Sequence, residues 1–122
     1  MTIALLAAAG ALGALARYGV SVAAVRWGPA TFPWGTLAVN LVGCFALGYL
    51  GAMAFGDPDH GARMRLIAGT GFLGAFTTFS TFGVETFRAL EAGEWGVAAA
   101  NVGINVVGGV ALAAAGFYFA RG

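Results

Sequence analysis

Three amide side chains are the most unusual polar groups in this sequence, because each falls within a long apolar stretch. They are Asn40, Asn101 and Asn105. An asparagine amide offers two donors and an acceptor, and all of them need partners away from water. Asn101 and Asn105 are four residues apart and so share a helix face, and Asn40 should point to the same interior. Two interpretations stay open: the amides form interhelical hydrogen bonds, or their NH2 groups line a path for an anion.

A second set of polar groups is concentrated in one stretch, Gly74-Ala75-Phe76-Thr77-Thr78-Phe79-Ser80-Thr81-Phe82. Glycine and β-branched residues disfavour a continuous helix. A broken helix exposes carbonyl and amide groups that can bind ions, and carbonyl oxygens suit a hard cation. The stretch therefore predicts a break at membrane depth, where irregular backbone needs shelter by protein or a cavity. The alternative is a threonine-rich helical turn without a break.

Two aromatic rings and two charges are further candidates. Phe79 and Phe82 are three residues apart and so share a helix face. Their ring edges carry partial positive charge and could attract a small anion, although core packing is the more ordinary interpretation. Arg17 and Glu85 could pair or reach the membrane surface, and Arg17 could also raise the local anion concentration at a pore mouth.

The composition of the chain indicates whether these polar groups lie in water or in a membrane. The chain has 122 residues, of which 60% are hydrophobic and 9% charged, whereas soluble domains carry about 25% charged residues. These figures argue against a soluble enzyme, a disordered tail and a nucleic-acid binder. A net charge of +1 also provides no basic patch for nucleic-acid phosphates. One cysteine and one histidine allow neither an intramolecular disulfide nor a zinc cage. Cys44 and His60 are interpreted as structural or solvated, and the class is an integral membrane protein.

Four stretches reach the roughly 20 apolar residues that a membrane-spanning helix needs. They run over about 3–25, 33–55, 66–90 and 95–119. Because the connections are short, residues 1–122 are predicted to form a single four-helix transmembrane domain with both termini on one side. Small residues four apart, such as Gly48 and Ala52, predict seams of close helix packing.

The arginines do not give this domain a clear orientation. The membrane face that carries the termini has three, and the opposite face has two, or three if Arg17 reaches that way. Orientation follows the bias of Lys and Arg between the two faces. Either the orientation is set weakly, or the chain inserts both ways and pairs with an inverted copy. The arginines in question are Arg63, Arg65 and Arg121 on the first face, and Arg26 and Arg88 on the second.

Four blocks of the chain carry recognisable motifs: Gly10–Tyr18, Pro33–Phe45, Gly71–Phe82, and a weaker Gly- and Asn-containing last span. Together these blocks resemble the bacterial fluoride channels of the Fluc/CrcB family. The third block, with its Thr-Thr-Phe-Ser-Thr-Phe run, is highly specific. The resemblance covers nearly the whole length.

The resemblance implies an all-α membrane protein of four helices, with the third broken at the Thr-Thr-Phe-Ser turn. It also implies an antiparallel, dual-topology dimer in the bacterial inner (plasma) membrane. A structural sodium ion is expected at the dimer centre, held by the backbone carbonyls of Gly74 and Thr77 from both subunits. Pores at the dimer interface would export cytoplasmic fluoride passively, so no enzyme activity is expected. The predicted fluoride pathway comprises Asn40, Phe79, Phe82, Thr36, Ser80, Asn105 and Glu85, with Arg17 in a structural or vestibule position.

The fourth span departs from the family pattern. Asn101 and Asn105 stand where the family usually shows a tyrosine and a first serine, and Gly109 stands where a further hydroxyl would come. An asparagine amide can still donate to fluoride, so conduction is compatible with these residues. One pathway could nevertheless be weakened, and the chain could be one subunit of a heterodimer with a paralogous chain.

Two other functions fit a short four-helix membrane protein. A small proton-coupled multidrug exporter needs a carboxylate deep in the membrane, typically in the first span, where this chain has no acid. A structural membrane subunit would not need polar groups on the second, third and fourth spans. Measurement of fluoride efflux separates these alternatives.

Overall fold

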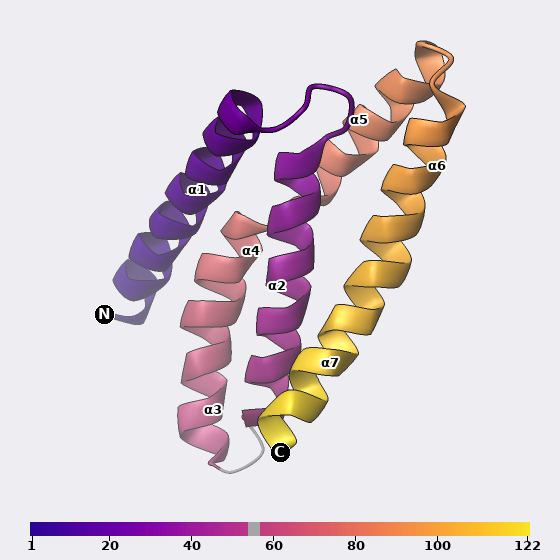
Figure 1. Cartoon of the computed structure of the whole chain (residues 1–122). Coiled ribbons are helices and arrows are strands. Elements are labelled where there is room, and N and C mark those ends of the chain that lie inside the picture. The colour runs from indigo at the N-terminus through magenta and orange to yellow at the C-terminus, as the bar shows by residue number, and fades with distance from the viewer. Residues whose placement is uncertain (54–56) are drawn as a thin grey trace.

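The computed structural model describes residues 1–53 and 57–122, and these residues form four long helical spans (Figure 1). All four are long and apolar enough to cross a membrane, which confirms the predicted number. The first two are α1 (Thr2–Trp27) and α2 (Trp34–Met53). The third consists of α3 (Pro58–Met64), the π-helical segment η1 (Arg65–Leu73), α4 (Gly74–Phe76) and α5 (Phe79–Glu91). The fourth consists of α6 (Trp95–Gly103), the π-helical η2 (Ile104–Gly108) and α7 (Gly109–Arg121).

The third span begins at Pro58, earlier than the predicted Leu66. Asp57 caps this start, because its Oδ1 accepts hydrogen bonds from the backbone N–H groups of Asp59 at 3.1 Å and His60 at 3.3 Å. A proline in the first helical position suits such a start, since it lacks an N–H that would need a partner. The predicted end of the second span, at residue 55, lies outside the described residues.

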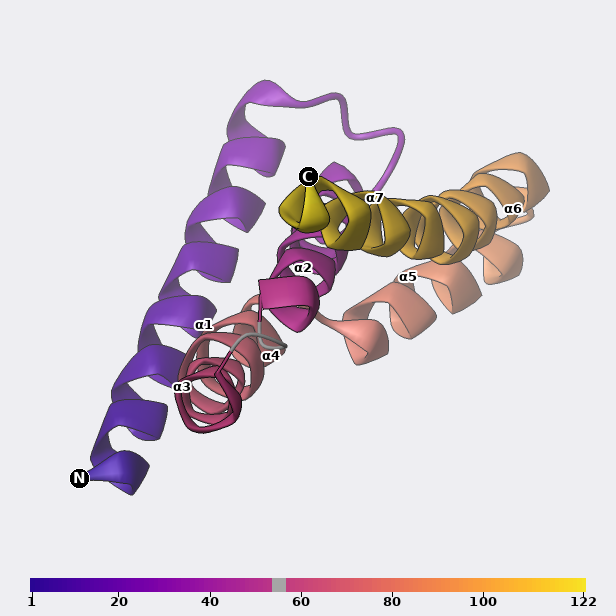
Figure 2. The same cartoon turned by 90° about the horizontal axis from the view of Figure 1, so that it is seen from below.

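The second span lies at the centre of the molecule. Seen from below, α1 lies on one side of α2 and the α6–α7 span on the other (Figure 2). Both termini lie at the end opposite the α1–α2 and α5–α6 connections (Figure 1). The two halves of the third span pack on different neighbours: η1 and α4 contact α1, whereas α5 contacts α6. The predicted break in this span therefore has a packing consequence, because it moves the chain from one side of α2 to the other.

Glycines allow the closest helix contacts. A Cβ atom added at Gly48 of α2 would lie 2.0 Å from the backbone oxygen of Ala113 in α7, and one at Gly116 would lie 2.1 Å from that of Phe45. Lipid tails are as apolar as leucine, so helix association in a membrane depends on this kind of backbone approach. The predicted small-residue seam is thus present between α2 and α7.

Replacement of Gly48 by alanine should destabilise the chain, because its added methyl group overlaps the backbone of α7. Overpacking of this kind typically costs about 1–3 kcal/mol. Gly51→Ala is the matched control, because among the described residues an added Cβ there meets nothing within 4 Å apart from its chain neighbours and its own helix backbone. Thermal unfolding in detergent should show a lower Tm for Gly48→Ala and no loss for Gly51→Ala. Equal Tm values for the two variants would contradict this packing.

Candidate functional site

The third span is interrupted at two adjacent threonines. Thr77 (φ −84°, ψ 160°) and Thr78 (φ −152°, ψ 118°) have extended backbone between α4 and α5. Thr78 is also the N-cap of α5, since its Oγ1 accepts from the backbone N–H of Thr81 at 3.3 Å. The break predicted from the Gly- and Thr-rich composition is therefore present, and a continuous threonine-rich turn is ruled out for this structure.

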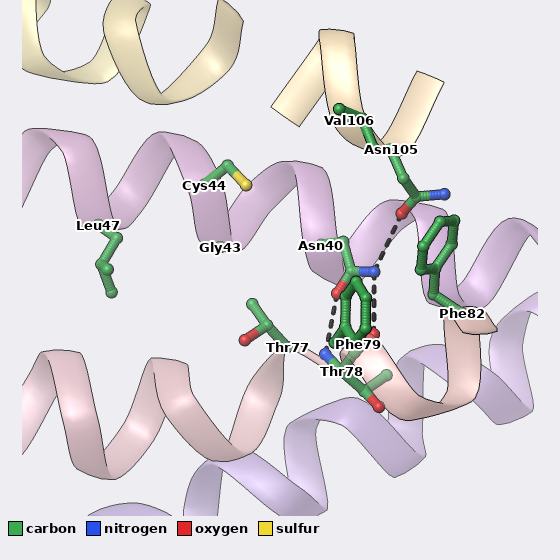
Figure 3. A pocket seen from close by; sticks show the side chains of 10 residues that line it. All are labelled: Asn40, Gly43, Cys44, Leu47, Thr77, Thr78, Phe79, Phe82, Asn105 and Val106. Atoms are coloured by element: carbon green, nitrogen blue, oxygen red, sulfur yellow. Dashed lines mark hydrogen bonds between the residues drawn. The ribbon is translucent and has the colours of Figure 1, made fainter. Parts of the chain in front are cut away.

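The side chain of Asn40 holds the extended peptide (Figure 3). Its Oδ1 accepts from the backbone N–H of Thr78 at 2.9 Å, and its Nδ2 donates to the carbonyl oxygen of Thr78 at 3.1 Å. The amide thus pairs with both polar groups of one residue, as a neighbouring strand would. This pairing supplies partners that an interrupted helix lacks, and buried backbone groups need such partners.

The same contacts free two carbonyl oxygens. In a continuous helix the N–H of Thr78 would donate to Gly74, and the N–H of Thr81 would donate to Thr77. Here the first N–H donates to Asn40 and the second to the side chain of Thr78. The carbonyls of Gly74 and Thr77 therefore lose their helical donors. These are the two predicted cation ligands, and both residues border a pocket of about 460 Å³.

A chain of hydrogen bonds continues from Asn40 across the molecule. Nδ2 of Asn40 donates to Oδ1 of Asn105 at 3.0 Å, and Nδ2 of Asn105 donates to the backbone oxygen and Oδ1 of Asn101 at 2.8 and 2.9 Å. Nδ2 of Asn101 donates to Oγ1 of Thr86 at 2.9 Å, and that hydroxyl donates to the carbonyl of Phe82 at 2.8 Å. The interhelical hydrogen bonds considered for the asparagines are therefore present.

A pocket of about 300 Å³ lies beside the break, and four of the predicted pathway residues line it (Figure 3). They are Asn40, Phe79, Phe82 and Asn105. The centroids of the two phenylalanine rings are 5.6 Å apart, and the ring planes are inclined at 53°. Phe82 is buried at 8% exposure, whereas Phe79 is 82% exposed in the single chain, and the predicted Ser80 is also exposed.

Three other predicted residues lie around two further cavities. Thr36 donates its hydroxyl to Oε1 of Glu85 at 2.7 Å, and both border a cavity of about 320 Å³. Arg17 borders a second cavity of about 250 Å³, which Thr36 also lines. Oε2 of Glu85 is buried and has no hydrogen-bond partner among the described residues. Glu85 is therefore paired with Thr36, and the Arg17–Glu85 pair left open by the sequence is not formed.

The sequence did not single out several residues that shape the site. Cys44 lines the pocket beside the break, although it was interpreted as structural. Its position four residues after Asn40 places it on the same helix face and could have indicated this. Thr86 joins Asn101 to Phe82, and no spacing pattern points to it because its partner Asn101 lies on another span.

The family of this chain follows from comparison with known sequences. The sequence model of the family described as "CrcB-like protein, Camphor Resistance (CrcB)" matches residues 4–117. The chain belongs to this family. The resemblance inferred from the sequence blocks is thereby confirmed, and CrcB-family membership together with the four apolar spans makes the chain a multi-pass membrane protein.

Several CrcB-family relatives are similar to this chain along most of its length. A protein of Thermococcus onnurineus is 45% identical over 95% of this chain and 93% of its own length. A protein of Dehalococcoides mccartyi is 44% identical over 95% of this chain and 89% of its own. A protein of Salinibacter ruber is 46% identical over 91% of this chain and 83% of its own length. Each of these relatives is named "Fluoride-specific ion channel FluC".

Replacement of Asn40 by leucine should destabilise the chain, because the N–H and C=O of Thr78 lose their partners. A buried polar group left without a partner costs about 1–3 kcal/mol. Val42→Leu is the control, since Val42 lies on the same helix and is 57% exposed. Thermal unfolding in detergent should show a clearly lower Tm for Asn40→Leu than for Val42→Leu. An unchanged Tm for Asn40→Leu would show that the break does not depend on Asn40.

Proposed function

We propose that this chain is a subunit of a fluoride-selective channel that lets fluoride leave the cell passively. One observation carries the proposal: the pocket beside the break is lined both by side-chain amides and by a pair of phenylalanine rings. The name shared by the relatives, fluoride-specific ion channel, supports the choice of ion. Passage of an ion through a pore makes and breaks no covalent bond, so the chain is not an enzyme.

The chemistry of the pocket suits a small anion. Fluoride is strongly hydrated, so removal of its water is costly unless other donors replace it. The amide of Asn40 can supply N–H donors, and the ring edges of Phe79 and Phe82 carry partial positive charge. The helix α5 begins at Phe79, and the start of a helix favours negative charge. Conduction also needs release, and several weak contacts favour release over one strong contact.

A second copy of the chain and a sodium ion belong to this proposal. The freed carbonyls of Gly74 and Thr77 are hard oxygen donors, which fit sodium, and Gly74 is exposed on the single chain. An unpaired carbonyl facing hydrocarbon is costly, so these oxygens need a partner in a bilayer. The carbonyls of two inverted copies would hold the ion, whose positive charge would support an anion nearby. The near-balance of arginines between the two membrane faces supports an antiparallel dimer, with pores at its interface.

Fluoride efflux from liposomes tests the function directly. Purified chain should release internal fluoride to a fluoride electrode without any requirement for a drug or a proton gradient. Phe82→Ile should lower the flux by up to about tenfold, because an aromatic pair contributes about 0.5–1.5 kcal/mol. Phe87→Ile should not, since Phe87 is 61% exposed on the same helix and does not line the pocket.

Three other results would each change a different part of this assignment. Drug-dependent proton flux without fluoride efflux would identify a multidrug exporter. No flux of either kind would indicate a structural subunit, or a heterodimer that lacks its partner; addition of a paralogous chain would restore efflux only in the second case. Equal fluxes for Phe82→Ile and Phe87→Ile would leave fluoride conduction standing and remove the phenylalanine rings from the pathway.

Removal of sodium should impair the assembled protein. Prolonged dialysis into a buffer with N-methyl-D-glucamine as the only cation should lower the fraction of dimer and the fluoride flux, because the freed carbonyls lose their shared ion. Size-exclusion chromatography and the efflux assay provide the two measurements, and return of sodium should restore both. A dimer fraction and a flux that stay constant would show that Gly74 and Thr77 hold no sodium ion.

A further inference from the structure

Four side chains form a hydrogen-bonded relay whose donors all run in one direction. The relay consists of Asn40, Asn105, Asn101 and Thr86, and it begins at the backbone N–H of Thr78 and ends at the carbonyl of Phe82. It leaves the third span, passes through the second and fourth spans, and returns to the third. Hydrogen bonds arranged in series polarise one another, so a change at one end affects the other.

The donors of Asn40 are fully used within this relay. Its Nδ2 carries two hydrogens, of which one is donated to the carbonyl of Thr78 at 3.1 Å and the other to Oδ1 of Asn105 at 3.0 Å. An anion in the pocket can therefore reach an N–H of Asn40 only by replacing one of these two acceptors. The peptide of Thr78 is held by a second hydrogen bond, which its N–H donates to Oδ1 of Asn40. The side-chain oxygen of Asn105 is the acceptor that can be replaced.

We propose that Asn105 acts as a surrogate anion: its Oδ1 occupies the acceptor position on Asn40 that fluoride takes during conduction. This inference rests on the proposed fluoride function and assigns Asn105 a role opposite to the donor role expected from the sequence. Its own Nδ2 is already directed at Asn101. An internal acceptor that competes with the ion weakens binding and so speeds release, as conduction requires.

Asn101 and Thr86 are positioning residues for this exchange. Asn101 is 1% exposed, contacts Asn105 on one side and Thr86 on the other, and so fixes where Asn105 returns after the ion leaves. Thr86 does not line the pocket beside the break. Any effect of Thr86 on fluoride affinity is therefore indirect, through Asn101 on one side or through Phe82 on the other.

Fluoride flux measured against fluoride concentration tests the proposal. Asn105→Leu removes the competing acceptor, so the half-saturating concentration should fall about two- to tenfold, the range expected for one neutral hydrogen bond. The maximal flux should fall too, because release becomes slower. Val107→Leu is the control, since Val107 lies on the same span, is 70% exposed and does not line the pocket. An unchanged or raised half-saturating concentration in Asn105→Leu would overturn the proposal.

A matched pair at Thr86 keeps the test informative if Asn105→Leu does not fold. Thr86→Val keeps the shape of the side chain but removes the hydroxyl. It should also lower the half-saturating fluoride concentration, by a smaller factor than Asn105→Leu. Thr86→Ser should restore the wild-type value. A purely structural role would change the amount of active protein and leave half-saturation constant in both variants, which would overturn the relay.

A measurement without flux separates this inference from the proposed function. The side-chain amide resonances of 15N-labelled Asn40 should shift on addition of sodium fluoride, at a lower concentration in Asn105→Leu or Thr86→Val than in wild type. If the resonances shift at these relative concentrations but no efflux is seen, the channel function is rejected, and the exchange of fluoride for the Asn105 oxygen at Asn40 is still supported. No shift, or equal midpoints, would reject the surrogate role even if efflux is present.

Discussion

The pairing of the Asn40 side chain with the Thr78 peptide is the interaction on which the rest of this structure depends. A continuous helix would give the N–H of Thr78 to Gly74, and Asn40 competes by offering an acceptor at 2.9 Å and a donor at 3.1 Å together. The carbonyl of Leu73 closes the first half, because it accepts from both the N–H of Thr77 at 3.0 Å and the hydroxyl of Thr77 at 2.9 Å. In a medium without water, such side-chain partners are what allow two extended residues within a membrane span.

The break gives its two sides opposite electrostatic character. On the side of α4 it leaves the carbonyl oxygens of Gly74 and Thr77 without helical donors, which favours a cation. On the side of α5 it creates a helix start next to the amide of Asn40 and the rings of Phe79 and Phe82, which favours an anion. The break also directs α5 toward α6, so that Thr86 and Asn101 can meet. The proposed cation site, the proposed anion site and the packing of α5 thus all depend on a single irregular peptide.

Much of this arrangement could be predicted from the sequence, because composition and spacing act locally. The apolar stretches gave the four spans, and the Gly- and Thr-rich run gave the position of the break. The pairing of Asn40 with Thr78 could not be predicted in this way, since the two residues lie on different spans. The π-helical segments η1 and η2 could not be predicted either. A π-helix differs from an α-helix in its hydrogen-bond spacing and not in the types of residue it contains, so composition does not reveal it. The different exposures of Phe79 and Phe82 were likewise hidden by a spacing that places both on one helix face.

Solid-state NMR of the chain in lipid bilayers tests the central claim most directly. With 13C and 15N labels on asparagine and threonine, the account predicts extended-backbone chemical shifts for Thr77 and Thr78, and a through-space correlation between the Asn40 side-chain amide and the Thr78 peptide. Helical shifts for both threonines, without that correlation, would mean that the third span is continuous in the membrane and would contradict the account.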